Sequence, residues 1–276
     1  MPTLNMPTLS ELLEAGAHFG HKKERSFPKA KKFTYTIRDS VYVIDLEKTL
    51  EGLTSAINKL QELFQEGKII LFIGTKRQAK EAVKKTAESL KMPYVVERWL
   101  GGMLTNYETI NKSLKQLEKL EELTKNPEFQ KYTKKERKRI EEKIAKILST
   151  FGGLRKMIKL PDALFVVDTA EEKVAVLEAR KMEIPIIGIC DTNANPDLVD
   201  YPIPANDDSE KTINLLLNKI AESLKGLKAD VKKDEKTEIK DTKSDTKKEK
   251  NLSTELTSTE KEKLGVSSST TLEVKE

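Results

Sequence analysis

Short apolar runs alternate with amphipathic stretches along most of the chain. Continuous apolar runs at 69–73, 163–167 and 186–190 are typical of parallel strands that are buried on both faces. Segments 48–65 and 208–225 instead place apolar residues three or four positions apart, as amphipathic helices do. This alternation predicts an α/β fold with a mainly parallel sheet and helices on both of its faces.

Further elements complete the predicted sheet and its helical cover. Strands are predicted at 41–46 and 94–96, and helices are predicted at 76–90 and 171–182. Segment 201–204 reads as one more short strand and contains two prolines. Because proline cannot donate a hydrogen bond to a sheet ladder, we expect this strand at the edge of the sheet.

The middle of the chain, 107–158, has no strand pattern. Its apolar residues recur every three or four positions in two arms, which are separated by a turn at Asn126 and Pro127. This predicts an inserted antiparallel helical hairpin with a coiled-coil seam, interrupted near its end by Gly152 and Gly153. The seam residues are Tyr107, Ile110, Leu114 and Leu117 in the first arm, and Ile140, Ile144, Ile147, Phe151, Leu154 and Ile158 in the second.

These patterns predict three regions. Residues 1–106 and 159–227 form the α/β globular domain, and residues 107–158 form the inserted coiled-coil hairpin. Residues 228–276 are rich in Lys, Glu, Asp, Ser and Thr and contain no aromatic residue. Such a segment cannot bury enough apolar surface to offset chain entropy, so we expect a disordered charged tail.

Charge is distributed unevenly, although 50 basic and 45 acidic residues give a net charge of only +5. Residues 110–159 contain 15 basic and 7 acidic side chains, whereas residues 160–227 contain 6 basic and 13 acidic ones. A basic middle followed by an acidic region favours a protein that places one side against a polyanion.

Several protein classes are excluded by composition. The single cysteine, Cys190, permits neither an internal disulfide nor a cysteine metal cluster. Apolar stretches are too short to span a membrane, and the first residues lack the basic and apolar regions of a signal peptide. We therefore expect a cytoplasmic protein.

Basic residues interleaved with aromatic ones suggest contact with RNA. Segment 22–38, interpreted as a loop, combines seven cations with Phe27, Phe33 and Tyr35, a pattern suited to phosphate contacts and base stacking. A second basic group lies near the predicted hairpin turn, where a solvated helix face is the ordinary alternative. The candidate RNA-binding residues are Lys22, Lys23, Arg25, Lys29, Lys31, Lys32, Arg38, Lys76, Arg77, Arg98, Lys134, Lys135, Arg137, Lys138 and Arg139.

An enzyme acting on a phosphorylated small molecule is a competing hypothesis. A turn at Gly74 leads into a helix whose N-terminus, at Thr75, can hold the phosphate of a nucleotide or of an RNA backbone. Neither GxxxxGK[ST] nor GxGxxG occurs, so a tight strand-to-helix turn is the favoured interpretation. Polar clusters at 191–197 and 206–208 follow predicted strands, where α/β enzymes place active sites. No nucleophile and base accompany them, so turn formation and capping of the last helix by Asp207 or Asp208 are favoured.

Two other features leave alternatives open. His18 and His21 are the only histidines, and folding can bring Asp191 and Asp207 close enough to form a metal site with them. Local hydrogen bonding is the favoured interpretation, and we predict no metal and no cofactor. The segment 99–107, with its paired glycines and the only tryptophan, is a core plug, a hinge for the hairpin or an RNA contact.

Seven strings, in this order, resemble the bacterial small-subunit ribosomal protein S2 family across about residues 8–225. They are AHFGH at 17–21, FIGTKR at 72–77, RWLGGMLTN at 98–106, TKKE at 133–136, LPDALFV at 160–166, DTN at 191–193 and IPANDD at 203–208. One departure lies at 26–30, where Ser-Phe-Pro-Lys-Ala replaces the family's Trp-Asn-Pro-Lys-Met, so any stacking or packing by that tryptophan passes to Phe27 or is absent.

The resemblance implies a flavodoxin-like or Rossmann-like domain with a coiled-coil hairpin. It also implies a structural, non-enzymatic role in the cytoplasmic small ribosomal subunit, without a cofactor or small-molecule substrate. The implied partners are small-subunit rRNA near the head–body junction and neighbouring small-subunit proteins, including the OB-repeat ribosomal protein S1, which the family helps to dock during translation. A protein-docking module that uses the hairpin is compatible with this role.

Overall fold

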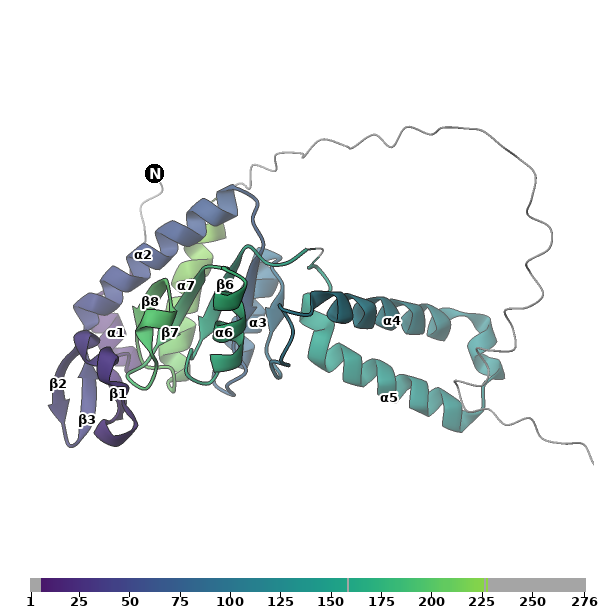
Figure 1. Cartoon of the computed structure of the whole chain (residues 1–276), viewed down its shortest axis with the longest axis horizontal. Helices are drawn as coiled ribbons and strands as arrows, with labels where there is room; N and C mark the ends of the chain where they lie inside the picture. Colours follow the sequence, from purple (N-terminus) through teal and green to yellow (C-terminus); the bar gives the residue numbers. More distant parts are fainter. Residues whose placement is uncertain (1–5, 158, 226, 228–276) are drawn as a thin grey trace, which may run out of the picture. The chain divides into compact units, whose positions relative to one another are not determined.

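The larger of two sheets is parallel throughout and has five strands in the order β5-β4-β6-β7-β8. Figure 1 labels β6, β7 and β8 of this sheet. The computed structural model describes residues 6–157, 159–225 and 227. The predicted tail 228–276 and the predicted seam residue Ile158 lie outside them. The strands are β4 (Ile70–Ile73), β5 (Tyr94–Val95), β6 (Ala163–Val167), β7 (Ile186–Cys190) and β8 (Tyr201–Pro204).

Both faces of this sheet are covered by helices, as the sequence pattern predicted. Because successive strand residues point to opposite faces, Phe72 packs in one apolar cluster and Leu71 packs in the other. The first cluster includes residues of α2 (Leu46–Gln65), α3 (Lys80–Leu90) and α7 (Glu210–Lys225), and the second includes residues of α6 (Lys173–Lys181). The proline-containing strand β8 lies at the sheet edge, as expected.

A second, antiparallel sheet corrects the prediction that 22–38 is a loop. Its strands are β1 (Phe19–Lys22), β2 (Thr34–Arg38) and β3 (Val41–Ile44), in the order β1-β3-β2, and the 3-10 turns η1 (Lys23–Arg25) and η2 (Pro28–Phe33) join β1 to β2. Strand β2 is formed by backbone pairing with β3, and its residues from Tyr35 onward are exposed. Phe33, Tyr35 and Ile37 alternate with polar residues, which is a strand signal in the sequence that the interpretation as a loop did not use.

One helix was not predicted, and another begins later than predicted. A short helix, α1 (Leu9–Ala15), precedes the small sheet and begins with a reciprocal capping box between Thr8 and Glu11. The spacing of those two residues was a signal in the sequence that we did not use. Helix α3 begins at Lys80 instead of residue 76, because the residues after Gly74 form a turn before the helix starts.

The segment predicted as a helical hairpin contains two helices that contact each other, α4 (Tyr107–Lys125) and α5 (Lys134–Phe151). The turn η3 (Pro127–Lys131) lies between them (Figure 1). Ile110, Leu114 and Leu117 of α4 are buried, but no α5 residue is fully buried. Side-chain interdigitation of the coiled-coil type therefore stays a prediction.

The predicted interruption at Gly152 and Gly153 is present. Helix α5 ends at Phe151 and the 3-10 turn η4 (Gly152–Leu154) follows. A Cβ atom on Gly153 would collide with the backbone oxygen of Tyr94 in strand β5. Glycine is thus required where the chain leaves α5 and packs against the sheet edge.

Candidate nucleic-acid interface and a buried carboxylate cluster

Seven candidate cations lie on the small sheet and its 3-10 turns. Lys22 ends β1, Lys23 and Arg25 belong to η1, and Arg38 ends β2. The remaining three, Lys29, Lys31 and Lys32, lie in η2. All seven side chains are exposed, because the turns and the unburied strand β2 present them to solvent.

Three of these cations have an ion-pair partner, and the pair of Arg38 with Asp39 is long, at 3.9 Å. The carboxylate of Asp197 lies 2.5 Å from the Lys29 Nζ and 3.4 Å from the Lys32 Nζ, and the hydrogen bond from Lys29 lowers the pKa of Asp197. Within the part of the chain that the structure describes, no carboxylate lies within ion-pair distance of Lys22, Lys23 or Arg25. The segment thus keeps most of its positive charge available for an anionic partner.

The aromatic side chains of this segment differ in accessibility. Tyr35 is 79% exposed, whereas Phe27 and Phe33 are half-buried. The backbone N–H of Phe27 donates to the carbonyl of Thr192, and Lys32 lies over the Phe33 ring with its Nζ 5.1 Å from the centroid. Of the three, Tyr35 is the most accessible to a partner.

The second basic group forms the start of α5. Lys134, Lys135, Lys138 and Arg139 are exposed and Arg137 is half-buried, while Thr133 and Glu136 cap the helix reciprocally. Lys138 pairs weakly with Glu142 at 3.9 Å. Cations at a helix N-terminus oppose the helix macrodipole, so this cluster costs stability and favours a role in binding.

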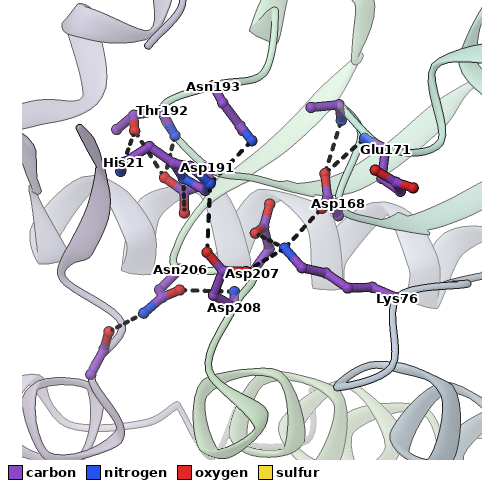
Figure 2. A network of polar contacts seen from close by, with 12 residues as sticks. His21, Lys76, Asp168, Glu171, Asp191, Thr192, Asn193, Asn206, Asp207 and Asp208 are labelled. Carbon is purple, nitrogen blue, oxygen red and sulfur yellow. Dashed lines mark hydrogen bonds and ion pairs between the residues drawn. The ribbon is translucent and has the colours of Figure 1, made fainter. Parts of the chain in front are cut away.

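The three remaining candidates have different surroundings. Arg77 and Arg98 are exposed, and Arg98 immediately precedes the buried Trp99. The Lys76 side chain is only 18% exposed, and its Nζ lies 2.7 Å from Asp207 and Asp208 and 3.0 Å from Asp168 (Figure 2). Phosphate contact by Lys76 stays a prediction, but the structure already provides this ammonium with three carboxylates.

These carboxylates follow neighbouring strands of the parallel sheet. Asp168 comes directly after β6, Asp191 after β7, and Asp207 three residues after β8. The carboxyl ends of parallel strands lie along one edge, which is the common ligand site of α/β folds. Tertiary structure also brings His21 of β1 to this edge, where Nδ1 lies 3.0 Å from Asp191 and Nε2 lies 3.5 Å from Asp208.

The two histidines therefore do not form a shared site. The hydrogen bond to Asp191 raises the pKa of His21, although its partial burial opposes the shift. His18 lies against the ring of Phe19, with centroids 4.0 Å apart, and partial burial lowers its pKa. His18 does not belong to the carboxylate cluster of the described residues.

The cluster contains a set of atoms that could hold a metal ion. His21, Asp191, Asp207 and Asp208 each offer one ligand atom, and these atoms lie within 4.8 Å of one another. Oδ2 of Asp207 is buried and has no hydrogen-bond partner among the described residues. One imidazole and three carboxylates suit a divalent cation. This geometry supports a metal site that includes His21, Asp191 and Asp207, the alternative that was not favoured from the sequence.

Stability is expected to fall as the pH rises from 6 to 8. Burial raises the pKa of Asp207 to about 8, and the pKa of His21 is also raised, so the folded chain holds more protons than the unfolded chain in this range. The stabilising contribution of Asp207 is complete only below its unfolded pKa of 3.8 and is lost as the pH rises to about 8, and the contribution of His21 is lost as the pH rises above its unfolded pKa of 6.5. Calorimetry in EDTA should show Tm falling by about 2–4 °C for each 1 kcal/mol lost. His21→Gln should flatten the dependence, and a Tm that rises over this range would contradict it.

The capping prediction for the last helix was wrong, whereas the strand-to-helix turn favoured after Gly74 is present. Thr212 donates its N–H to the hydroxyl of Ser209, so Ser209 caps α7 in place of Asp207 or Asp208. The N–H of Thr75 donates to Oε1 of Glu172 at 2.9 Å, and α3 begins only at Lys80. A glutamate thus occupies the turn where the enzyme hypothesis placed a phosphate.

Among the described residues, no helix has the length and apolar composition needed to cross a membrane.

Sequence comparison identifies a family over most of the chain. Residues 12–226 match the family model of ribosomal protein S2. Over 219 residues, which are 79% of this chain, it is 48% identical to the small ribosomal subunit protein uS2 of Helicobacter acinonychis, covering 89% of that protein. The corresponding proteins of Helicobacter hepaticus and Wolinella succinogenes are 47% and 46% identical, with 83% and 81% of their lengths covered. The chain therefore belongs to the ribosomal protein S2 family, whose members are structural proteins of the ribosome and not enzymes.

Proposed function

We propose that this protein binds small-subunit rRNA near the head–body junction of the cytoplasmic ribosome and helps to dock ribosomal protein S1 during translation. Family membership supports the ribosomal role. The observation that carries the RNA-binding part is the group of five cations at the start of α5, which opposes the helix macrodipole and has little carboxylate pairing among the described residues. The exposed cations of 22–38 form the second contact region.

The domain organisation is part of this proposal. Residues 1–106 and 159–227 are the globular domain, and α4 and α5 form a coiled-coil hairpin within 107–158. The buried face of α4 and its contacts with α5 support the hairpin. In this arrangement the basic residues of α5 lie beside the turn η3, at the opposite end of α4 from the sheet.

An apolar surface supports the docking of a protein partner. Leu9 and Leu13 of α1 and Tyr35 of β2 line one groove and are exposed. Exposed apolar and aromatic side chains that share a groove are typical of protein-binding surfaces. We assign this groove to ribosomal protein S1, and the basic segments to rRNA.

Neutralising the α5 cations should weaken binding and flatten its salt dependence. The variant replaces Lys134, Lys135, Arg137, Lys138 and Arg139 with Gln. The slope of log affinity against log salt should fall by about one unit for each lost phosphate contact. Binding is measured by sedimentation with small subunits depleted of this protein, across a salt series, and the ribosomal protein S1 content of the same fractions tests the docking role.

A matched control removes the same number of charges elsewhere. Lys84, Lys85, Lys91, Lys181 and Lys211 are exposed lysines outside both basic segments, and their change to Gln should leave the slope unaltered. An unchanged slope in the α5 variant would remove this group from the interface. Failure of the wild-type chain to bind depleted subunits would overturn the proposed function itself.

A further inference from the structure

A buried carboxylate on α6 has an unusually complete set of hydrogen-bond donors. Glu178 is 9% exposed. Its Oε1 accepts from the N–H of Gly102 at 2.7 Å and from the indole Nε1 of Trp99 at 3.2 Å. Its Oε2 accepts from the N–H groups of Leu104 and Thr105, at 3.1 and 3.3 Å, and from the Thr105 hydroxyl at 3.3 Å. Both carboxylate oxygens are thus bound by one chain segment, 99–105.

These donors are directed at one point by the shape of the segment. Gly102 has a φ of +94°, a left-handed conformation that glycine adopts without strain. Two backbone hydrogen bonds form turns in and next to this segment. The N–H of Met103 donates to the carbonyl of Leu100, and the N–H of Asn106 donates to the carbonyl of Gly102. Successive N–H groups that converge in this way form an anion-binding concavity. In this protein the anion is supplied by the chain itself.

The bound state of Glu178 is ionised. Burial alone would raise the pKa of this carboxyl, but hydrogen bonds from Gly102, Leu104 and Trp99 outweigh burial and hold the pKa below its usual value. Removal of the carboxylate would leave several N–H groups without an acceptor beside Trp99, Met103 and Leu104, which are all buried. A buried unpaired N–H is costly, so the segment would have to rearrange.

Any rearrangement would act directly on the start of α4. Asn106 precedes the first residue of α4, and its N–H is already bonded to Gly102. Ile110 and Leu114 of α4 lie in the same apolar cluster as Trp99 and Met103. At the base of the pair of helices, the Tyr107 hydroxyl donates to the carbonyl of Met157 at 2.5 Å. The segment 99–105 is therefore the chain connection through which α4 is held against the sheet.

We propose that Glu178 is a positioning residue that fixes where α4 begins, and through α4 where the basic start of α5 lies. The effect of this positioning on RNA binding rests on the proposed function, in which the cations of α5 contact RNA. Helix α4 has 19 residues, so a change at its first turn is carried over about 28 Å to the turn η3. Glu178 touches no RNA in this account, and acts by supplying the anion around which segment 99–105 folds.

The test uses the full chain with three variants. Glu178→Gln keeps the size of the side chain but replaces one acceptor oxygen with an NH₂ group that faces N–H donors. Glu178→Ala removes the carboxylate and leaves space for a small anion, for which sodium formate is the probe. Glu171→Gln is the matched control, because it removes the same charge from an exposed side chain seven residues earlier.

Two measurements report the local effect without RNA. Amide hydrogen exchange follows Gly102, Leu104 and Thr105, with the amides of β6 as internal reference. Spin labels on Lys84→Cys and Ser149→Cys follow the position of α5 relative to α3, because both residues line the cleft between these helices. Binding to depleted small subunits is measured in parallel, and wild-type binding in that assay tests the proposed function separately.

In Glu178→Gln we expect exchange at the three amides to accelerate about tenfold to a hundredfold, which is the range for losing buried hydrogen bonds. Exchange in β6 should not change, and the distance distribution between the labels should broaden. Formate, but not chloride at equal ionic strength, should restore protection and the narrow distribution in Glu178→Ala. An unchanged label distribution, or rescue by chloride alone, would overturn the proposal. Global unfolding of both variants that formate does not reverse would also overturn it.

Discussion

Replacing Lys76 with methionine is expected to lower the free energy of unfolding by about 3–5 kcal/mol, the range found when a buried charge loses its partner. The Lys76 Nζ is the cation that Asp168, Asp207 and Asp208 share, and the first two carboxylates are buried. Methionine retains most of the aliphatic volume, so the loss reports on charge. Urea denaturation of the full chain, in EDTA, measures it.

The matched control is Lys80→Met. Lys80 pairs with Glu97 at 2.7 Å, but Glu97 is more than half exposed, and such pairs contribute only about 0–1 kcal/mol. A Lys76→Met variant as stable as the control would show that the cluster does not need this ammonium.

Gly52→Ala should destabilise the protein by about 2–3 kcal/mol through overpacking, although alanine is the better helix former. Gly52 lies inside α2, where that helix packs on strand β8. A Cβ atom at this position would come within 2.5 Å of the Pro202 carbonyl oxygen and 2.9 Å of Pro204 Cδ. Neither is the end of a flexible side chain, so α2 must move away from the sheet edge. Thermal and urea denaturation measure the loss.

Gly101→Ala provides the comparison for this substitution. A Cβ atom at Gly101 would meet nothing within 4 Å, and its φ lies outside the left-handed region. It should change stability by no more than about 0.5 kcal/mol, the usual range for surface changes. If Gly52→Ala proves neutral or stabilising, the close approach of α2 to β8 is not a constraint on the fold.

The parallel sheet was predictable because its strands are buried on both faces. Such strands are short uninterrupted apolar runs, and β4, β6 and β7 were found from their sequences alone. The edge position of β8 followed from its two prolines. Of the small antiparallel sheet, β3 was predicted as a strand, but β1 and β2 were missed, although Phe33, Tyr35 and Ile37 alternate with polar residues along β2.

The carboxylate cluster was foreseen only in part. Polar residues after β7 and β8 were recognised, and the approach of Asp191 and Asp207 to His21 was considered as one alternative. The role of Lys76 as the shared counter-ion of Asp168, Asp207 and Asp208 was not foreseen. These three partners lie 92, 131 and 132 positions further along the chain. The hydrogen bonds of the Glu178 carboxylate were not foreseen either, because the N–H donors lie 73 to 79 positions earlier in the chain.

Sequence alone determined the elements that depend on local patterns: the buried strands, the amphipathic helices, the two basic segments and the family strings. Tertiary structure alone decided which charges are available and which are already satisfied. Periodicity reports which face of an element is buried, but a carboxylate selects its partner by distance in space. Lys76 and Lys134 therefore look alike in the sequence, yet one is shared by three aspartates at the sheet edge and the other is exposed on α5.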